Sequence, residues 1–453
     1  MSDLLIRNAK AIVTCDGDDR ILHNSHLLIE NNRIAAIGTG EWTADRVIDG
    51  SGMIIYPGLV NTHHHLYQTF TRNLPQVQRM ELFPWLKTLY EIWRGLTDDM
   101  IYYSSLTGMG ELLKYGCTTC FDHHYVFPQG RSGFFIDRQF AAAKALGIRF
   151  HASRGSMSRG VSDGGLPPDD LVQTVDTILK DSQRLIEKYH DPNPYSMRQM
   201  ALAPCSPFSV TPDLMTQTVT LAREFGVRLH THLAETNDEE QYCLVTKGQR
   251  PLAYMESLGW VGDDVWYAHG IHFTDDELKL LADTGTGVAH CPVSNQKLSS
   301  GIAQVPRMLE MGVPLGLAVD GSASNDSSNL LAELRACYLL HRLHSSANAP
   351  DGYQLLKVAT AGGAALLGRN DIGSLETGKG ADLFMVNVNR LEYVGTHFDP
   401  ASLLCTVGVN RPVDYTIVNG RVVVEKGELV TIDEQRTAVA ANELVQKLNR
   451  KLP

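Results

Sequence analysis

The chain has 453 residues, of which 40 are Lys or Arg and 51 are Asp or Glu, giving a formal net charge of −11. Binding to a nucleic-acid polymer or an anionic membrane needs a surplus of basic residues, and no basic run occurs, so both partner classes are excluded. Apolar residues make up 43% and charged residues 20%, which supports a large globular core and excludes wholesale disorder.

The N-terminus and the cysteines predict a reduced, cytoplasmic protein. Residues 1–10 lack the basic flank and apolar core of a secretory signal, and no apolar run approaches the roughly 20 residues that span a bilayer. Eight scattered cysteines do not make a disulfide scaffold. Cys117 and Cys120 form a C-x-x-C within an apolar, strand-like run, so we interpret both as core residues and not as a redox or zinc motif.

The two ends of the chain share one sequence pattern, in which short apolar runs alternate with turn residues. In residues 1–57, Asn31-Asn32 lies between two such runs and predicts a hairpin. Residues 368–433 show the same pattern, so we expect a small β-sandwich domain built from both termini. Residues 434–453 predict a C-terminal helix. No low-complexity linker separates these parts from the middle, so they are expected to pack on it.

The middle, residues 58–367, alternates apolar, strand-like runs with helical stretches, and each run ends in a polar cluster. The eight runs are residues 53–65, 117–124, 147–156, 200–210, 227–236, 265–272, 286–295 and 313–325. Helices are expected at residues 103–116, 139–147, 171–190 and 214–226. Such alternation predicts a parallel sheet, and eight repeats favour a distorted α/β barrel of the (β/α)8 TIM type over a doubly wound open sheet, which stays the alternative.

The most informative segment is Asn61-Thr62-His63-His64-His65, at the end of the first run. Side chains alternate along a strand, so His63 and His65 point to one side and His64 to the other. The carboxyl ends of barrel strands meet at one face, which holds the active site. Two imidazoles on that face predict a metal chelate.

Other strand ends supply the missing ligands. His232 ends the fifth run and Asp320 the eighth, which completes a set of three nitrogens and one carboxylate suited to zinc or ferrous iron. A metal held there would lower the pKa of a bound water towards about 7, and Asp320 could also accept the proton of that water. His230 competes as a ligand; we favour His232 because Glu235 follows it by three residues.

Glu235 and His269 are the expected catalytic groups beside Asp320. Glu235 could relay a proton from water to a ring nitrogen or a leaving group, and the alternative is a solvated loop residue like Glu239 and Glu240. His269, at the sixth strand end, could donate a hydrogen bond to the nucleophile or to a developing oxyanion; the alternative is an ordinary core histidine. No H-E-x-x-H, no completed P-C-x-x-C and no phosphate loop is present.

Several segments carry a family resemblance, namely PGLVNTHHH, HLAET, AHG, CPVSN and AVDGSASN. They are similar to the amidohydrolase superfamily, specifically its cytosine deaminase, guanine deaminase and triazine hydrolase branch, over nearly the whole chain. The resemblance implies that the four ligands above bind the metal, that Glu235 shuttles protons and that His269 contacts the nucleophilic water. Binuclear relatives use a modified Lys near the fourth strand end, and residues 203–207 contain none, so we expect one divalent metal, zinc before iron.

Within that branch, longer segments such as ELFPWLKTLY and RGSMSRGVSDGGLPP are similar to enzymes that act on 8-oxoguanine. The implied reaction is hydrolytic deamination of 8-oxoguanine to urate and ammonia. Isoxanthopterin, guanine, an adenosine-like nucleoside and a triazine are alternative substrates of the same site. A barrel that keeps its metal only for binding or structure is a further alternative, disfavoured because all the catalytic groups are present.

Four residues are expected to contact the substrate: Gln68, Arg154, Cys205 and Trp85. Gln68 and Arg154 could hydrogen-bond purine carbonyls, and Trp85 or Tyr67 could stack on the ring, although each has a structural alternative. Residues 154–168, rich in Gly and Ser, are expected to form either a closing loop or an ordinary barrel loop. The expected partner is a small purine-like molecule, and a homo-oligomer is compatible with the sequence.

Overall fold

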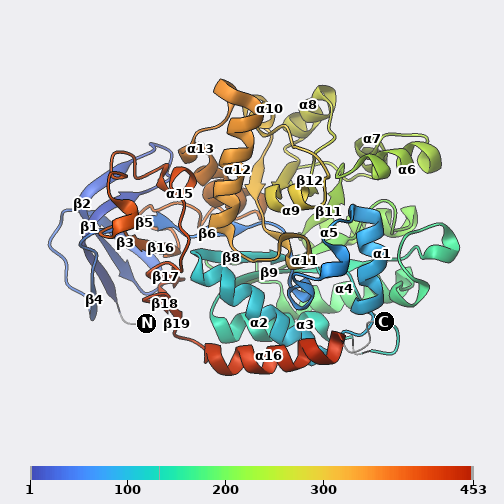
Figure 1. Ribbon diagram of the computed structural model, residues 1–453, viewed down its shortest axis with the longest axis horizontal. Coiled ribbons are helices and arrows are strands. Elements are labelled where there is room, and N and C mark those ends of the chain that lie inside the picture. Colours follow the sequence, from blue (N-terminus) through green and yellow to red (C-terminus); the bar gives the residue numbers. More distant parts are fainter. Residues whose placement is uncertain (1–2, 132, 450–453) are drawn as a thin grey trace.

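The computed structural model describes residues 3–131 and 133–449. In Figure 1, strands from the two ends of the chain, coloured blue and red, lie together on the left, and a parallel-stranded barrel with its surrounding helices fills the centre and right.

Eight parallel strands form the barrel, each paired with its neighbours in chain order. They are β6 (Leu59–Asn61), β8 (Cys117–Asp122), β9 (Arg149–Ser156), β10 (Arg198–Pro204), β11 (Arg228–Leu233), β12 (Val265–His269), β13 (Gly287–His290) and β14 (Leu315–Leu317). The order never reverses, so the doubly wound alternative is wrong and the predicted α/β barrel is confirmed.

The barrel closes where its last strand meets its first. The Thr62 backbone N–H donates to the Leu317 carbonyl at 3.3 Å, between β14 and β6. Just beyond, two short strands pair in parallel, β7 (His64–His65) with β15 (Asp320–Gly321). This second pairing lies at the carboxyl end of the barrel, the face that holds active sites in such folds.

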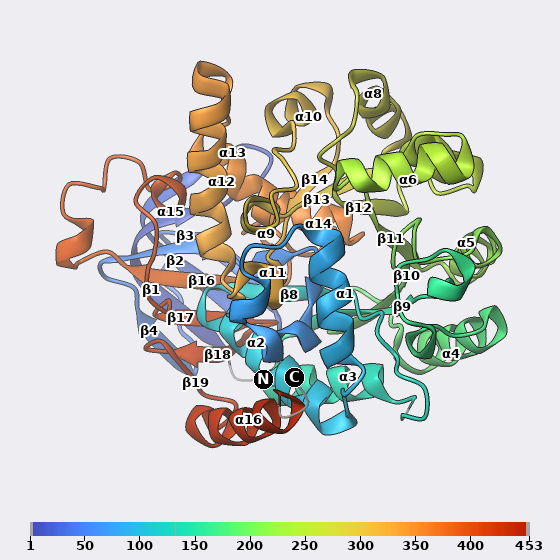
Figure 2. The ribbon, with the colours of Figure 1, turned by 45° about the vertical axis from the view of Figure 1, so that its right-hand side comes forward.

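The helices follow the strands as the alternation predicts. Those around the barrel are α2 (Asp98–Lys114), α3 (Phe135–Leu146), α4 (Val175–Tyr189), α5 (Pro212–Phe225), α6 (Asn237–Lys247), α7 (Pro251–Ser257), α8 (Asp275–Thr284), α10 (Val305–Met311), α12 (Leu330–Ser345), α13 (Gly352–Lys357) and α14 (Gly363–Leu366). Shorter or capping elements are η1 (Leu66–Thr71), η2 (Pro75–Val77), α1 (Leu82–Trp93), η3 (Val161–Asp163), η4 (Asp169–Leu171), α9 (Pro292–Lys297), α11 (Ser322–Asn325), η5 (Ser346–Asn348), the π-helical η6 (Val358–Gly362), η7 (Leu391–Tyr393) and α15 (Leu403–Thr406). Figure 2 shows α1 in front of the barrel strands.

Local capping explains where these helices begin and end. Thr211 accepts a hydrogen bond from the Leu214 N–H at the start of α5, and Gly226, at φ 65°, ends that helix in the left-handed conformation that glycine tolerates. The expected helix at residues 171–190 begins only at Val175, because the Thr174 side chain caps it there.

Strands from both termini form one nine-stranded, mostly antiparallel sheet in the order β19-β18-β17-β16-β5-β1-β2-β3, with β4 paired to β1. Their bounds are β1 (Leu4–Val13), β2 (Ile21–Glu30), β3 (Arg33–Gly38), β4 (Arg46–Asp49), β5 (Met53–Pro57), β16 (Leu383–Asn387), β17 (Tyr415–Val418), β18 (Arg421–Glu425) and β19 (Glu428–Leu429). Asn31, at φ 56°, turns the predicted hairpin between β2 and β3. The expected sandwich is thus built from one continuous sheet, which encloses an apolar cluster of its own. The division into domains at residues 57 and 367 stays a prediction.

The C-terminal helix, α16 (Glu434–Asn449), lies along the lower edge of Figure 1 beneath α2 and α3. Lys114 at the end of α2 donates to the Glu434 carboxylate at 2.5 Å. Residues 450–453 of the expected helix lie outside the described residues. In the described part of the chain, no helix is both long and apolar enough to cross a membrane. Cys117 and Cys120 are buried, free thiols in β8.

A buried ion pair ties the terminal sheet to the barrel. Arg149, the first residue of β9, donates from Nε and Nη2 to the two carboxylate oxygens of Asp382, each at 3.0 Å. The side chains are 0% and 2% exposed. Asp382 also accepts the Asn419 backbone N–H at 2.6 Å, so one carboxylate holds residues from both parts of the molecule.

We predict that Asp382→Ala lowers the free energy of unfolding by about 3–5 kcal/mol, because it leaves the Arg149 guanidinium buried without its counter-ion. Denaturant or thermal unfolding measures the change. The matched control is Glu425→Ala, which removes a half-exposed partner of Arg46 and should cost about 0–1 kcal/mol. Equal, small effects of the two substitutions would contradict the prediction.

Candidate metal centre and active site

The pairing of β7 with β15 places three predicted ligands together. Asp320 Oδ1 lies 3.2 Å from His63 Nε2 and 3.4 Å from His65 Nε2. Asp320 adopts a left-handed φ of 60°, an uncommon conformation for a residue other than glycine. His64 points away, as expected, and its Nε2 lies 3.0 Å from the Ser328 hydroxyl.

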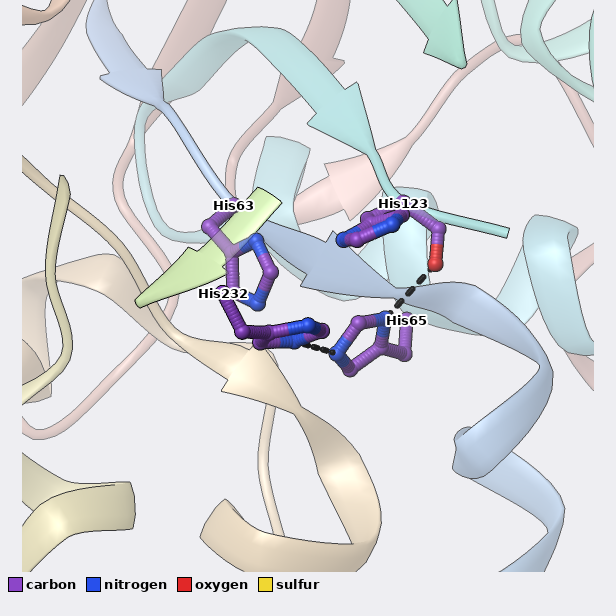
Figure 3. A group of neighbouring side chains, drawn as sticks. All are labelled: His63, His65, His123 and His232. Atoms are coloured by element: carbon purple, nitrogen blue, oxygen red, sulfur yellow. Dashed lines mark hydrogen bonds between the residues drawn. The ribbon is translucent and has the colours of Figure 1, made fainter. Parts of the chain in front are cut away.

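His232, from β11, completes the group on the opposite side. Figure 3 shows its ring facing His65, with the two Nε2 atoms 3.1 Å apart. His65 Nδ1 contacts the His123 carbonyl at 2.6 Å, and His232 Nδ1 contacts the Cys205 carbonyl at 2.6 Å. A carbonyl only accepts, so each Nδ1 carries the proton and each Nε2 presents a lone pair to the centre.

His63 also carries its proton on Nδ1, and in this case the acceptor is a second imidazole, that of His230. His230 Nδ1 donates to the Trp266 carbonyl at 2.9 Å, so His230 Nε2 is an acceptor, and it lies 2.8 Å from His63 Nδ1. His63 therefore donates from Nδ1 and leaves Nε2 unprotonated towards Asp320. The structure thus places His230, the competing ligand of the sequence analysis, behind His63 and not at the centre.

This donor set fits a metal ion. The lone pairs of His63 and His65 face one carboxylate oxygen, and His232 Nε2 faces His65 Nε2. Neutral acceptors 3.1 Å apart repel one another unless a cation lies between them. Tetrahedral zinc with bonds of about 2.0–2.1 Å separates its ligand atoms by about 3.3–3.4 Å, close to the 3.1–3.4 Å observed. Fixing each ligating histidine through its other nitrogen is also the usual arrangement around protein-bound metals.

His123 is a site residue that the sequence analysis missed. It follows β8, stacks on His232 with ring centroids 4.8 Å apart, and contacts the Ala203 carbonyl through Nε2 at 2.7 Å. Its ring nitrogens lie close enough to those of His63, His65 and His232 to share a metal. The signal was present, because His123 and His124 end the strand-like run at residues 117–124, in which the sequence analysis considers only the two cysteines.

A second buried group, His290 of β13 with Cys337 and His341 of α12, lacks this pattern. The two Nε2 atoms lie 3.3 Å apart, but among the described residues neither Nδ1 atom has a hydrogen-bond partner. No outer group therefore fixes these rings as ligands. We interpret the cluster as packing between strand and helix.

Asp320 is held as a carboxylate. Its Oδ2 accepts the Ser294 hydroxyl at 2.5 Å, and its Oδ1 accepts the Gly321 N–H at 2.6 Å. Both donors stabilise the charged form of this buried carboxyl group. The group can thus ligate a cation and accept a proton from a neighbouring water.

Glu235 follows the last residue of β11 by two positions and is 4% exposed, so the alternative of a solvated loop residue does not hold for it. Its Oε2 is 3.5 Å from His269 Nε2, and its Oε1 accepts the Ser300 hydroxyl at 3.3 Å. Burial, followed by the charges of Asp320 and Glu239, raises the pKa of Glu235 well above its usual range. Such a carboxyl group keeps its proton more readily than an exposed glutamate, so it is suited to general acid–base work.

His269 ends β12 in a left-handed conformation, at φ 74°. The Asn295 amide lies 2.9 Å from its Nδ1 and, as a donor, leaves the proton on Nε2, on the side of Glu235. Burial lowers the pKa of His269 to about 4, so the ring is a neutral hydrogen-bond donor. Residues with such strained backbone conformations are often found at active sites, where surrounding contacts hold them in place.

The pocket beside these groups contains three of the four expected substrate contacts, Gln68, Trp85 and Cys205. Gln68 Oε1 and Trp85 Nε1 are buried there without a hydrogen-bond partner among the described residues. Burial raises the pKa of the Cys205 thiol to about 12, so it stays neutral. The sequence analysis missed the remaining, mostly apolar lining, because it comes from loops, from α1 and from the short helix α11: Leu82, Leu86, Tyr125, Phe208, Leu298 and Ser324.

Arg154 does not join the pocket. Its guanidinium group donates to Asp181 at 2.7 Å and to Gln173 at 2.7 Å, and it lies over the Phe127 ring at 3.8 Å. This geometry does not make the expected contact with a purine carbonyl, because Nε, Nη1 and Nη2 of the guanidinium already donate to Asp181, Gly155 and Gln173. The loop that follows is fastened by backbone hydrogen bonds from residues 158 and 159 to the Ser209 carbonyl.

We predict that His230→Phe weakens metal binding about 10- to 100-fold, because His63 loses the acceptor that keeps its Nε2 unprotonated. Competition with a chromogenic chelator measures the affinity. His290→Gln is the matched control, since it alters a buried histidine outside the metal cluster and should leave the affinity unchanged. The converse result, with loss in His290→Gln alone, would contradict this description of the site.

Comparison with known proteins places this geometry in a family. Residues 54–423 match the Amidohydrolase family. The chain is 46% identical to 8-oxoguanine deaminase of Pseudomonas aeruginosa over 96% of each chain. It is 40% identical to hydroxydechloroatrazine ethylaminohydrolase of Pseudomonas sp. over 99% of this chain and 96% of that one. A solved atrazine chlorohydrolase from Arthrobacter aurescens, complexed with zinc, superposes with a TM-score of 0.95 at 35% identity over 98% of this chain and all of the other. The chain therefore belongs to the amidohydrolase family.

Proposed function

We propose that this protein is a metal-dependent aminohydrolase that converts 8-oxoguanine and water into urate and ammonia. The observation that carries the proposal is the buried pocket in which the Glu235 carboxyl group, the His269 imidazole and the histidine cluster face one another. The 46% identity to a relative named 8-oxoguanine deaminase supports the choice of substrate.

We assign the metal to four ligands, which are His63, His65, His232 and Asp320. A bound divalent cation would supply the Lewis acidity that makes a water molecule nucleophilic near neutral pH. We propose one ion per chain, because no lysine lines the pocket in the described part of the chain, and zinc, because a solved relative was obtained with it. Ferrous iron would use the same ligand chemistry.

Three residues of the chain would transfer or donate the protons that the hydrolysis requires. Asp320 accepts a proton from the attacking water as the new C–O bond forms at the carbon that bears the exocyclic amine. Glu235 gives its proton to the ring nitrogen as the water attacks. Asp320 then passes the proton it accepted to the amine, the C–N bond breaks and ammonia leaves, while the hydroxyl proton of the former water returns to Glu235 and the product carbonyl forms. The Nε2–H of His269 donates to the oxygen on which negative charge develops.

Substrate recognition would use the unpaired polar atoms of the pocket. Gln68 Oε1 is an acceptor and the Trp85 Nε1–H is a donor, and an oxidised purine presents both lactam N–H groups and carbonyl oxygens. Phe208 and Leu86 offer apolar surface to the ring, and we place the Cys205 thiol at its edge. A triazine aminohydrolase is the second candidate, because a 40% identical relative bears that activity in its name.

The first test is ammonia release from a panel of 8-oxoguanine, guanine, isoxanthopterin and a hydroxylated aminotriazine. We expect the highest kcat/KM with 8-oxoguanine and formation of urate in equal amount to ammonia. Turnover of the triazine alone would favour the second candidate. Absence of turnover with every purine would refute the proposal.

The second test is Glu235→Gln. The amide keeps the shape of the side chain but cannot exchange protons, so kcat should fall by about 10²- to 10⁴-fold. Elemental analysis should still find about one metal per chain in the variant and in the unaltered protein. A near-normal kcat would show that another group moves the proton, and two tightly bound equivalents would contradict the single-metal assignment.

A further inference from the structure

Glu239, on the first turn of α6, turns its side chain back towards the end of β11. Its Oε1 accepts the Ala234 backbone N–H at 3.1 Å, and its Oε2 accepts the Glu235 N–H at 2.9 Å. The side chain is 1% exposed, so the sequence-based interpretation of Glu239 as a solvated residue is wrong. The Thr236 side chain caps α6 by accepting the Glu239 backbone N–H at 3.4 Å, so Glu239 lies in the first turn, close to the end of β11.

The backbone that Glu239 holds is strained. Ala234 has a left-handed φ of 53°, a conformation that costs a residue other than glycine about 1–3 kcal/mol and persists only where neighbouring contacts enforce it. The Ala234 carbonyl is fixed as well, by the N–H groups of Ile271 at 2.8 Å and His272 at 3.0 Å. Glu239 thus binds the backbone N–H groups of this turn, while the Ala234 carbonyl is bound from the other side.

The turn decides where Glu235 points. Side chains alternate along a strand, so residues 232 and 235, three positions apart, would face opposite sides if β11 simply continued. The left-handed residue at 234 breaks the alternation, and both side chains reach the same pocket. The position of the Glu235 carboxyl group therefore depends on keeping residue 234 in its strained conformation.

Glu239 has no ionic partner that would account for its burial. In residues 3–131 and 133–449, no Lys, Arg or His nitrogen lies within ion-pairing distance of its carboxylate. Its neighbour Glu240, by contrast, pairs with Arg250 at 2.7 Å nearer the surface. A buried carboxylate satisfied only by two backbone N–H groups is a costly way to stabilise a fold, but an effective way to fix those two peptides.

We propose that Glu239 is a positioning residue for the reaction, which holds the 234–235 turn so that the Glu235 carboxyl group faces the substrate. This inference rests on the proposed function of Glu235. It concerns the placement of that group and not the binding of substrate or metal, so loss of Glu239 should affect kcat far more than KM.

The test is Glu239→Gln, in which the amide oxygen still accepts one N–H while the amide nitrogen opposes the other. We expect kcat to fall about 10- to 100-fold, with KM within about threefold and metal content unchanged. Glu240→Gln is the matched control and should keep the kcat of the unaltered protein. Glu239→Asp, which keeps the charge on a shorter arm, provides a second variant and should lose less of kcat. Unchanged kcat in both variants at position 239 would overturn the proposal.

Two further measurements separate positioning from a general structural role. If Glu239 acts through Glu235, then Glu235→Gln/Glu239→Gln should be no slower than Glu235→Gln alone, whereas multiplicative losses would overturn the proposal. Hydrogen exchange of the 234 and 235 amides should accelerate in Glu239→Gln while the barrel strands stay protected; unchanged exchange would also overturn it. Exchange needs no substrate, so it decides this inference even if 8-oxoguanine is not turned over, which would refute the proposed function instead.

Discussion

The site depends on the closure of the barrel. Only where the strand pair β7 and β15 forms do His63 and His65, from one end of the barrel sequence, meet Asp320 from the other. The closure also brings imidazole lone pairs close to a buried carboxylate. These acceptors repel one another, and a bound cation would remove the repulsion, so the hydrogen bonds that close the barrel also form a site that favours a metal ion.

Around this centre, buried carboxylates hold the backbone beside site residues. Asp122 accepts the Leu66 N–H at 2.6 Å, directly after His65, and Glu333 accepts the Val293 N–H at 3.2 Å, directly before Ser294. Burial raises the pKa of Asp122 to about 7 and that of Glu333 to about 8. Glu239, whose pKa burial raises to about 7, belongs to the same class. Three backbone segments at the barrel mouth are thus each held by a buried carboxyl side chain from another element.

Sequence patterns predicted much of this arrangement. The fold and the family were confirmed, because strand-helix alternation is a local property that recurs eight times and the motifs are long. Arg154 and His230 show the limit of such reasoning. Both lie on barrel strands that lead to the site, but the guanidinium group is engaged by Asp181, and the imidazole supports His63 from behind. The position of a residue along a strand does not determine which residues from other elements its side chain contacts.

The sequence by itself determined which residues lie at the ends of the barrel strands, since the strands and their ends follow from local patterns of apolar and polar residues. Only the tertiary structure decided the protonation of each imidazole, because a distant carbonyl or a second histidine sets which nitrogen carries the proton. It also decided that Glu235 faces the pocket. That outcome requires a strained residue at 234 and a buried carboxylate from α6, and such strain is stable only when contacts from several elements enforce it together.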